Sequence, residues 1–284
     1  MNRLITSLVG VAVATSLALA VAAPVGASST AMVRVLHASP DAPAVDVYLD
    51  GTKVSALTDV PFGVISGYLA VPAGAHNVKV YATGTTTSPV IDADVTLTAG
   101  QKYTIAATGA LASISAQVIT DSPTPTCSTA QVRVVHFSAD APAVDIATTG
   151  STPAQALIKG LTYPNATAYL ALPAGTYDLE VRLAGTTTVA LPLPGVKVAA
   201  CESYSVFAIG SAASPAVGGH GLQVVVAVDA TATAAATMPA TDTVDPAPNA
   251  TAGVVGGQAV ILMIVATLAF LGGLRFVVRR VRQD

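Results

Sequence analysis

Apolar and polar residues alternate with a period of two along most of the chain between residues 33 and 228. In the first such segment, Val33, Val35 and His37 share one face, while Arg34 and Leu36 share the other. Successive side chains of a β-strand point to opposite faces, so this period predicts strands, and no segment here keeps a helical period. Short strands at this density are typical of an immunoglobulin-like β-sandwich, which has about seven strands in about 100 residues. We therefore expect an all-β fold.

The strand pattern occurs twice in the chain. Residues 33–47 (VRVLHASPDAPAVDV) and residues 132–146 (VRVVHFSADAPAVDI) are identical at 11 of 15 positions. A match this close within one chain indicates duplication of a folded unit. The sequence therefore predicts two tandem immunoglobulin-like β-sandwich domains.

A tyrosine opens the penultimate strand of each unit, shortly after a turn. In unit one the segment 97–103 (LTAGQKY) ends on Tyr103, and Tyr204 has the same place in unit two. This arrangement resembles the tyrosine corner of immunoglobulin-like domains, in which the hydroxyl group is hydrogen-bonded to the backbone. We expect both tyrosines to be structural residues.

Both ends of the chain carry long apolar segments. At the N-terminus, Arg3 precedes an apolar run and then small residues, which predicts a cleaved signal peptide over 1–27, with an uncleaved anchor as the alternative. Residues 254–274 are apolar except for Gln258 and are long enough to cross a bilayer as a helix. Four arginines between residues 275 and 282 follow this segment, so the positive-inside rule places the C-terminus in the cytoplasm.

These signals divide the chain into seven parts. The linker between the two units has two prolines, and the segment after unit two is rich in Ala, Thr and Pro and has no alternation, as in an extended stalk. The parts are a signal peptide (1–27), a β-sandwich repeat (28–121), a linker (122–130), a second β-sandwich repeat (131–229), a stalk (230–253), a transmembrane helix (254–274) and a basic cytoplasmic tail (275–284).

The charge of the exterior part excludes one class of partner. Residues 28–253 contain 8 basic and 15 acidic side chains, a net charge of −7. Nucleic-acid binding requires the opposite sign, so we expect no nucleic-acid partner. The partners that remain are the membrane, through the C-terminal helix, and an envelope polymer or another surface protein.

Two cysteines occur, both in or beside unit two. Cys127 precedes its first strand, and Cys201 precedes the strand that contains Tyr204. An even pair in an exported domain predicts one disulfide. Two free thiols, or a metal site, are the alternatives, although two cysteines without a nearby histidine make a poor metal site.

The duplicated segment carries the same three polar residues in each copy, with the spacing His-x-Ser-x-Asp. They are His37, Ser39 and Asp41 in unit one, and His136, Ser138 and Asp140 in unit two. These residue types allow a hydrolase, in which a serine needs a base and oxyanion donors. In a short segment between a strand and a turn, Ser and Asp more often bind backbone amides, so we favour a structural role and expect no catalytic residue and no cofactor.

Aspartates in the same region suggest a calcium site as a further alternative. Asp41, Asp46 and Asp50 offer oxygen ligands in unit one, and unit two keeps Asp140 and Asp145 but has Thr149 in the third place. The incomplete second set weakens the case for a shared ion. Asp46 and Asp145 are therefore grouped with the structural residues of the motif.

Several motifs of the chain occur together in one known family. The segment 33–51, the Tyr-Leu-x-x-Pro-Ala-Gly elements, the Gly-Thr-Thr-Thr turns and Ala-Gly-x-x-Tyr closely resemble the bacterial family of domain of unknown function 4397. The resemblance covers about residues 32–121 and 131–229. It implies a secreted or surface-attached protein with tandem domains, and it supplies no functional residues because the family has no established activity.

The leading interpretation is a membrane-anchored bacterial surface protein that displays two β-sandwich modules for adhesion, binding or envelope structure. A calcium- or carbohydrate-binding module and a hydrolase that uses His37 and His136 are the alternatives. A further weak signal is the segment 238–242 (MPATD), which resembles a sortase motif but departs from it at both ends.

Overall fold

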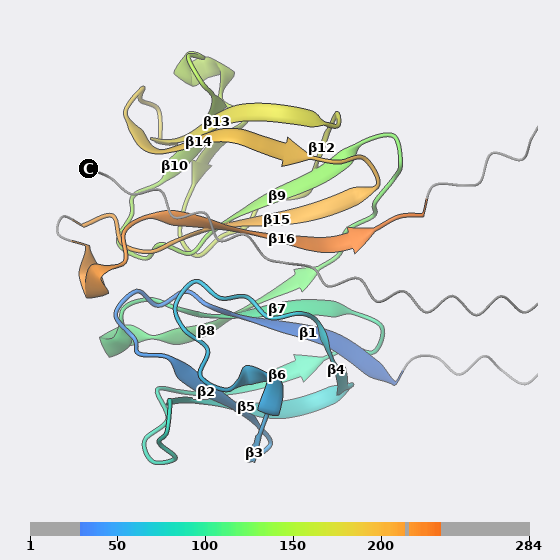
Figure 1. The fold of residues 1–284 in the computed structure, drawn as a ribbon, viewed down its shortest axis with the longest axis vertical. Coiled ribbons are helices and arrows are strands. Elements are labelled where there is room, and N and C mark those ends of the chain that lie inside the picture. The colour runs from blue at the N-terminus through green and yellow to red at the C-terminus, as the bar shows by residue number, and fades with distance from the viewer. Residues whose placement is uncertain (1–28, 214–215, 234–284) are drawn as a thin grey trace, which may run out of the picture.

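The computed structural model describes residues 29–213 and 216–233, which form an all-β protein of two similar halves (Figure 1). Each half contains two four-stranded sheets. The predicted signal peptide (1–27), transmembrane helix (254–274), tail (275–284) and all but the start of the stalk (230–253) lie outside the described residues. Within the described ranges, no helix has the length and apolar character needed to cross a membrane.

The first half contains eight strands and two short 3-10 turns. They are β1 (Thr30–His37), β2 (Val45–Leu49), β3 (Thr52–Lys53), η1 (Ser55–Leu57), β4 (Leu69–Pro72), β5 (Gly74–Ala82), β6 (Ile91–Leu97), β7 (Lys102–Thr108), η2 (Leu111–Ser113) and β8 (Ser115–Asp121).

The second half repeats this order. Its elements are β9 (Ala130–His136), β10 (Val144–Thr148), η3 (Pro153–Gln155), β11 (Ile158–Leu161), β12 (Leu170–Leu172), β13 (Gly175–Leu183), β14 (Val189–Val198), β15 (Glu202–Ile209), η4 (Val217–Gly219) and β16 (Gln223–Thr231).

The strand order differs from that of an immunoglobulin domain. The sheets of the first half run β4-β1-β7-β8 and β3-β2-β5-β6, and the second half has the equivalent orders β12-β9-β15-β16 and β11-β10-β13-β14. The first two strands of an immunoglobulin domain share a sheet, whereas β1 and β2 lie in different sheets because the loop 38–44 carries the chain across. The prediction of two tandem β-sandwiches is confirmed, and their strand order differs from that of an immunoglobulin domain.

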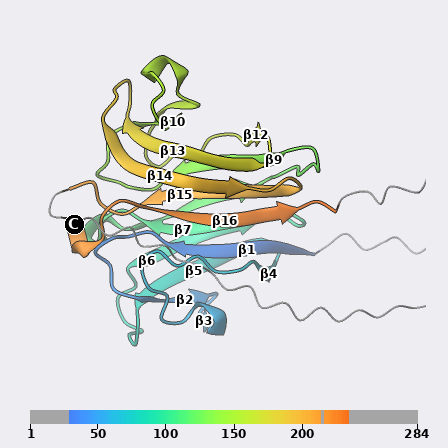
Figure 2. The ribbon, with the colours of Figure 1, turned by 45° about the horizontal axis from the view of Figure 1, so that its top comes forward.

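The two halves pack against each other through one sheet each, which makes four layers of sheet in all. Figure 2 shows β1 and β7 of the first half facing β15 and β16 of the second half. Leu36 of β1 and Ala106 of β7 pack in one buried cluster with Val135, Phe207 and Ile209. The duplicated units therefore share a hydrophobic core in addition to their own.

This arrangement explains why β1 is buried on both faces. Val33 and Val35 belong to the core of the first half, with Ile105 of β7. Arg34 and Leu36, on the opposite face, point into the contact between the halves, and both are almost fully buried. An alternating strand predicts one solvated face, but here the second face is covered by the other half.

Two Arg–Asp pairs cross the contact between the halves at equivalent positions. The Nη2 atom of Arg34 in β1 lies 2.5 Å from Oδ1 of Asp229 at the end of β16. Arg133 in β9 forms the equivalent ion pair with Asp121 at the end of β8. All four side chains are buried.

Further donors complete the hydrogen bonding of the two carboxylates. Asp121 accepts hydrogen bonds from Thr104 and Tyr68, and Asp229 accepts them from Ser205 and Tyr169. The guanidinium groups also stack over tyrosine rings, with Arg34 4.7 Å from the ring centroid of Tyr68 and Arg133 5.0 Å from that of Tyr169. Burial raises the pKa of both tyrosines, which keeps their hydroxyl groups protonated as donors.

We expect the variant Arg34→Met to lower the free energy of unfolding by about 3–5 kcal/mol, because it leaves Asp229 buried without its cation. Urea unfolding followed by circular dichroism measures this loss. Lys197→Met is the matched control, since Lys197 is exposed on β14, and it should change stability by less than about 0.5 kcal/mol. Equal stability of the two variants would show that the ion pair does not support the contact between the halves.

Candidate functional site

The His-x-Ser-x-Asp segment of unit one is tied to the backbone of its own half. The Nε2 atom of His37 lies 3.0 Å from the carbonyl oxygen of Pro43, and Asp41 accepts a hydrogen bond of 2.7 Å from the backbone N–H of Leu111. Nδ1 of His37 and the hydroxyl of Ser39 are buried and have no hydrogen-bond partner among the described residues. Burial lowers the pKa of His37, so the ring is neutral at pH 7.

The copy in unit two has similar contacts. The Nε2 atom of His136 lies 3.2 Å from the carbonyl oxygen of Pro142, and Ser138 donates a hydrogen bond of 2.7 Å to the carbonyl of Gly210. The carboxylate of Asp140 accepts hydrogen bonds from Ser211, Ala212 and Ala213. Burial alone would raise the pKa of Asp140, but these hydrogen bonds outweigh it and lower the pKa.

Neither copy has the geometry of a nucleophile and its base. A catalytic serine needs a histidine nitrogen within hydrogen-bond reach, and neither Ser39 nor Ser138 donates to its histidine. The space beside the motifs is also small. A cleft of about 50 Å³ lies between Pro40 and Asp140, and a cavity of about 40 Å³ with mainly apolar walls lies beside His136. These volumes hold a few water molecules.

Part of the second half covers the motif of the first half. A Cβ atom on Gly218 of η4 would lie 2.0 Å from the carbonyl oxygen of Pro40, so the two backbones touch at a position with φ +62° that only glycine fits. The ring of His220 stacks on Phe62 of the first half with centroids 4.3 Å apart, and Phe62 meets His37 edge-on. No pattern in the sequence predicted this contact, because it depends on how the halves pack.

Asp46 and Asp145 each connect two loops to a strand of the outer sheet. Asp46 accepts hydrogen bonds from the backbone N–H groups of Asp59 and Gly84 and from Nζ of Lys53. Asp145 likewise accepts from the N–H groups of Gly160 and Gly185. Both carboxylates are buried, so their function in the fold is to satisfy loop amides that would otherwise lack partners.

The structure does not bring the three calcium candidates together. Asp41 binds Leu111, Asp46 binds the loops described above, and Asp50 accepts from His76 and from the backbone N–H of Asn77. Across residues 29–213 and 216–233, no three His, Cys, Asp or Glu side chains are grouped so that they could hold a metal ion.

The two tyrosines have the contacts expected of a corner residue. The backbone N–H of Thr98 donates a hydrogen bond of 3.1 Å to the hydroxyl of Tyr103, and that of Ala199 does the same to Tyr204. The hydroxyl of Tyr204 also donates to the carboxylate of Glu202. Each tyrosine therefore fixes the turn that precedes its own strand.

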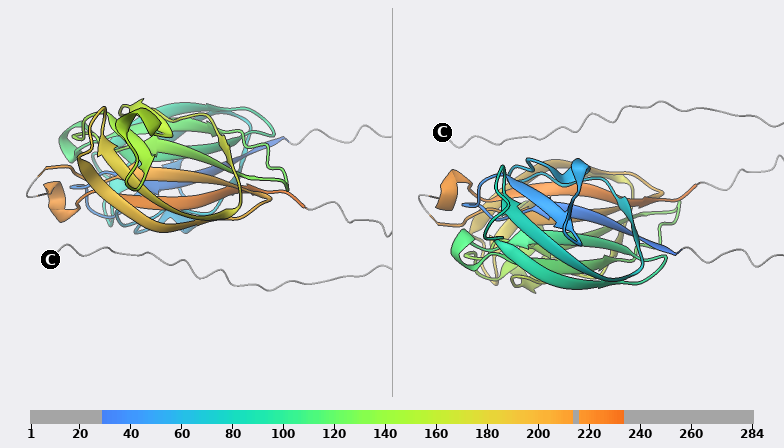
Figure 3. Two further views of the ribbon diagram at one scale, coloured as in Figure 1. Left: turned by 90° about the horizontal axis from the view of Figure 1, so that it is seen from above. Right: turned by 90° about the horizontal axis from the view of Figure 1, so that it is seen from below.

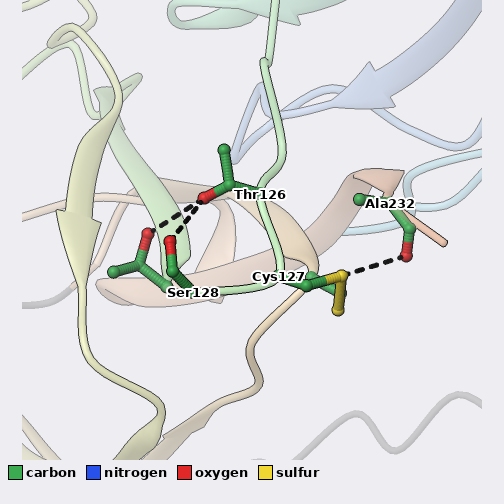
Figure 4. The surroundings of a disulfide bond; sticks show 6 residues. Thr126, Cys127, Ser128 and Ala232 are labelled. Carbon is green, nitrogen blue, oxygen red and sulfur yellow. Dashed lines mark hydrogen bonds between the residues drawn. A yellow bond between two sulfur atoms is a disulfide. The ribbon is translucent and has the colours of Figure 1, made fainter. Parts of the chain in front are cut away.

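Cys127 and Cys201 form a disulfide, as the sequence predicts (Figure 4). It lies where the chain leaves the second half, since Sγ of Cys127 is 3.8 Å from the carbonyl oxygen of Ala232. The N–H of Ala232 donates a hydrogen bond of 2.7 Å to the carbonyl of Cys201. Cys201 has φ +68°, and the corresponding turn residue of unit one is Gly100 with φ +75°.

The comparisons with known proteins give a family and distant structural likenesses. Residues 31–147 and 152–255 match the family described as Domain of unknown function (DUF4397). None of the curated proteins matches the chain.

Solved structures with similar segments include the Bacillus anthracis TIE protein, at 12% identity and a TM-score of 0.21, over 64% of this chain and 34% of that one. They also include a family 26 carbohydrate-binding module from Eubacterium rectale Amy13K in complex with maltoheptaose, at 11% identity and a TM-score of 0.24, over 72% of this chain and 98% of that one.

We expect Asp46→Asn to lower the free energy of unfolding at pH 7 by about 1–3 kcal/mol, because the amide cannot accept all three hydrogen bonds. The bond from Lys53 is the main cause that holds the pKa of Asp46 below its ordinary value of 3.8. The contribution of the carboxylate is therefore present above about pH 4 and is lost as the pH falls through the lowered pKa. Urea unfolding between pH 2 and 7 should show the variant losing less stability than the parent in acid.

Asp59→Asn is the control for this variant, since Asp59 is exposed and asparagine also tolerates its φ of +52°. If Asp59→Asn and Asp46→Asn behave alike, the buried carboxylate does not have the role assigned to it.

Replacing the disulfide should show the strain at Cys201. Removal of a bond between residues 74 positions apart costs up to about 4 kcal/mol by loop-closure entropy. The variant Cys127→Ser/Cys201→Gly should be more stable than Cys127→Ser/Cys201→Ser by about 1 kcal/mol, because glycine adopts a positive φ without strain. Thermal unfolding of both variants tests this, and a less stable glycine variant would contradict it.

Proposed function

Since the chain belongs to the DUF4397 family, whose function is unknown, we propose that it is a non-enzymatic surface protein of a bacterium. Its two fused β-sandwiches form a rigid head that binds an envelope polymer or another surface protein. The head stands outside the cell on the stalk 230–253, and the helix 254–274 anchors it in the membrane.

One observation carries the proposal: the chain enters and leaves the paired domains at the same end. Figure 3 shows the start of β1 and the end of β16 at one end, and η4 with the loops beyond β1 and β9 at the other. The ion pair between Arg34 and Asp229 also places the middle of β1 beside the last residues of β16. An anchor that follows residue 233 would therefore hold the head by its base and leave its sides and far end exposed.

The contact between the halves supports a rigid head. Interfaces between domains of one chain allow relative motion unless they are large and apolar, and this one combines an apolar cluster with two buried ion pairs. The disulfide adds to this at the base, where the chain passes to the stalk. In a rigid head, both domains keep a fixed position relative to the anchor.

The contacts of the repeated motif support a non-enzymatic role. Both histidines face backbone carbonyls, and the aspartates accept hydrogen bonds from neighbouring loops. These side chains have the partners of a structural turn, and the clefts beside them are small.

The topology can be tested with protease on intact cells from which the wall has been removed. The chain carries a tag after Asp284, and antibodies to each half detect the domains. We expect protease to remove both halves and to leave a protected fragment with the tag, because residues 275–284 lie in the cytoplasm under the positive-inside rule. Loss of the tag with survival of the domains would reverse the topology and overturn the proposal.

A further inference from the structure

The outermost sheet of the first half carries two tyrosines on the face that points away from the core. In β2, Tyr48 alternates with the core residue Val47, and in β5, Tyr81 alternates with the core residue Val80. The rings meet at 73° with their centroids 5.0 Å apart. Both side chains are only half-buried, so two aromatic surfaces are available to solvent at one place.

Polar side chains continue this face across β5 and β6. The register pairs Lys53 with Tyr48, Tyr48 with Lys79, and Lys79 with Asp92, so these four residues form one row across the sheet. Asn77 and Asp94 are paired in the next row. Strands lie about 4.8 Å apart, so the row from Tyr48 to Asp92 is about 10 Å wide.

The polar groups are held in place by one another. The side-chain amide of Asn77 donates one hydrogen bond of 2.9 Å to Asp92 and another of 2.9 Å to Asp94, and Lys79 lies 3.1 Å from Asp92. Both amide hydrogens of Asn77 are thereby used, while its carbonyl oxygen remains an acceptor. Oδ2 of Asp94 likewise makes no hydrogen bond within the described residues. The face therefore presents fixed acceptors and the ammonium groups of Lys53 and Lys79 beside two aromatic rings.

The second half has the same sheet without this face. At the positions of Tyr48 and Tyr81 it has Ala147 and Arg182. Arg182 is buried, bonded to Glu180, and donates a hydrogen bond of 2.7 Å to the carbonyl of Ser151. The same architecture therefore forms without the tyrosines, which means that the fold does not explain their presence in the first half.

We propose that this face, formed by Tyr48, Tyr81, Asn77, Lys79, Asp92 and Asp94, binds an uncharged, hydroxyl-rich polysaccharide. The C–H faces of sugar rings pack against aromatic rings, and sugar hydroxyls donate to carboxylate and amide oxygens and accept from an ammonium group. The charge of the face argues against a polyanion. Lys53 and Lys79 are the cations on this side of the sheet, against Asp46, Asp92 and Asp94. The exposed Asp50 lies close to Asn77, so negative charge is in excess and a phosphate-rich polymer would be repelled.

This inference names the class of partner that the proposed surface head binds. It rests on the proposed function only because that function places the face outside the cell. The test uses the purified full-length chain in a detergent without a sugar headgroup, so its outcome does not depend on the membrane topology. The probes are immobilised hexaoses of glucose, mannose, galactose and N-acetylglucosamine, together with poly(glycerol phosphate). We expect binding to at least one of the four hexaoses and none to poly(glycerol phosphate).

Variants of the two tyrosines identify the surface used. Tyr48→Ala and Tyr81→Ala should each weaken binding about tenfold, because each removes one ring that packs on the sugar, while the corresponding Phe variants keep the ring and most of the affinity. Val226→Ala removes an exposed apolar side chain of the second half and should leave binding unchanged.

Asp94→Ala is the control that separates a loss of binding from misfolding. Because Asp94 is exposed on the edge strand β6, its replacement should weaken binding without changing the thermal midpoint of unfolding. Binding to none of the hexaoses, or binding only to poly(glycerol phosphate), overturns the proposal. Binding that is unaffected by both alanine variants of the tyrosines overturns it as well.

Discussion

The two buried Arg–Asp pairs between the halves determine how the whole molecule is assembled. A buried charge is tolerated only when it is paired and hydrogen-bonded, and here each guanidinium finds its carboxylate on the opposite half. Arg34 reaches Asp229 while Arg133 reaches Asp121, so an approximately two-fold arrangement satisfies all four charges together. A shifted or rotated contact would leave at least one of them buried and unpaired.

Such pairs do more for specificity than for stability. Replacing a buried ion pair by well-packed apolar residues is often neutral or stabilising, whereas breaking one is costly. The apolar cluster around Phe207 and Leu36 supplies the area that favours contact between the sheets, because burial of apolar surface is not directional. We infer that the ion pairs select one register among the many that an apolar contact alone would allow. If one half were separated from the other, its arginine and aspartate side chains would lie on an exposed sheet and would be hydrated.

The sequence predicted the all-β class, the duplication and the disulfide, since these depend on local period, repetition and cysteine count. It did not predict the strand order, because the loop 38–44 is compatible with a connection within one sheet or between two. Arg34 and Arg133 occur at the same place within valine-rich strands, and this was the available signal for a second buried face. The partners Asp121 and Asp229 close the last strand of each unit, but no local pattern links them to arginines far away in the sequence.

The candidate site shows the same division between local and non-local information. The turn chemistry around Asp41 and Asp140 follows from residue type, and the structure places both carboxylates on backbone amides. Tyr48 and Tyr81 are far apart in the sequence, and only the pairing of β2 with β5 brings their rings together.

Duplication explains why one outer sheet could gain such a surface while the other did not. The shared contact constrains β1, β7, β9 and β15 in both copies, because each of these strands packs on two sides. The outer sheets pack on one side only, so substitutions on their free faces leave the core and the ion pairs intact. The second half shows one result of this freedom, in which Arg182 and Glu180 close the face against a loop. The first half shows the other result, which is an open face with aromatic rings and fixed polar groups. Because the two copies share one fold, this difference between them favours a binding role for the face of the first half.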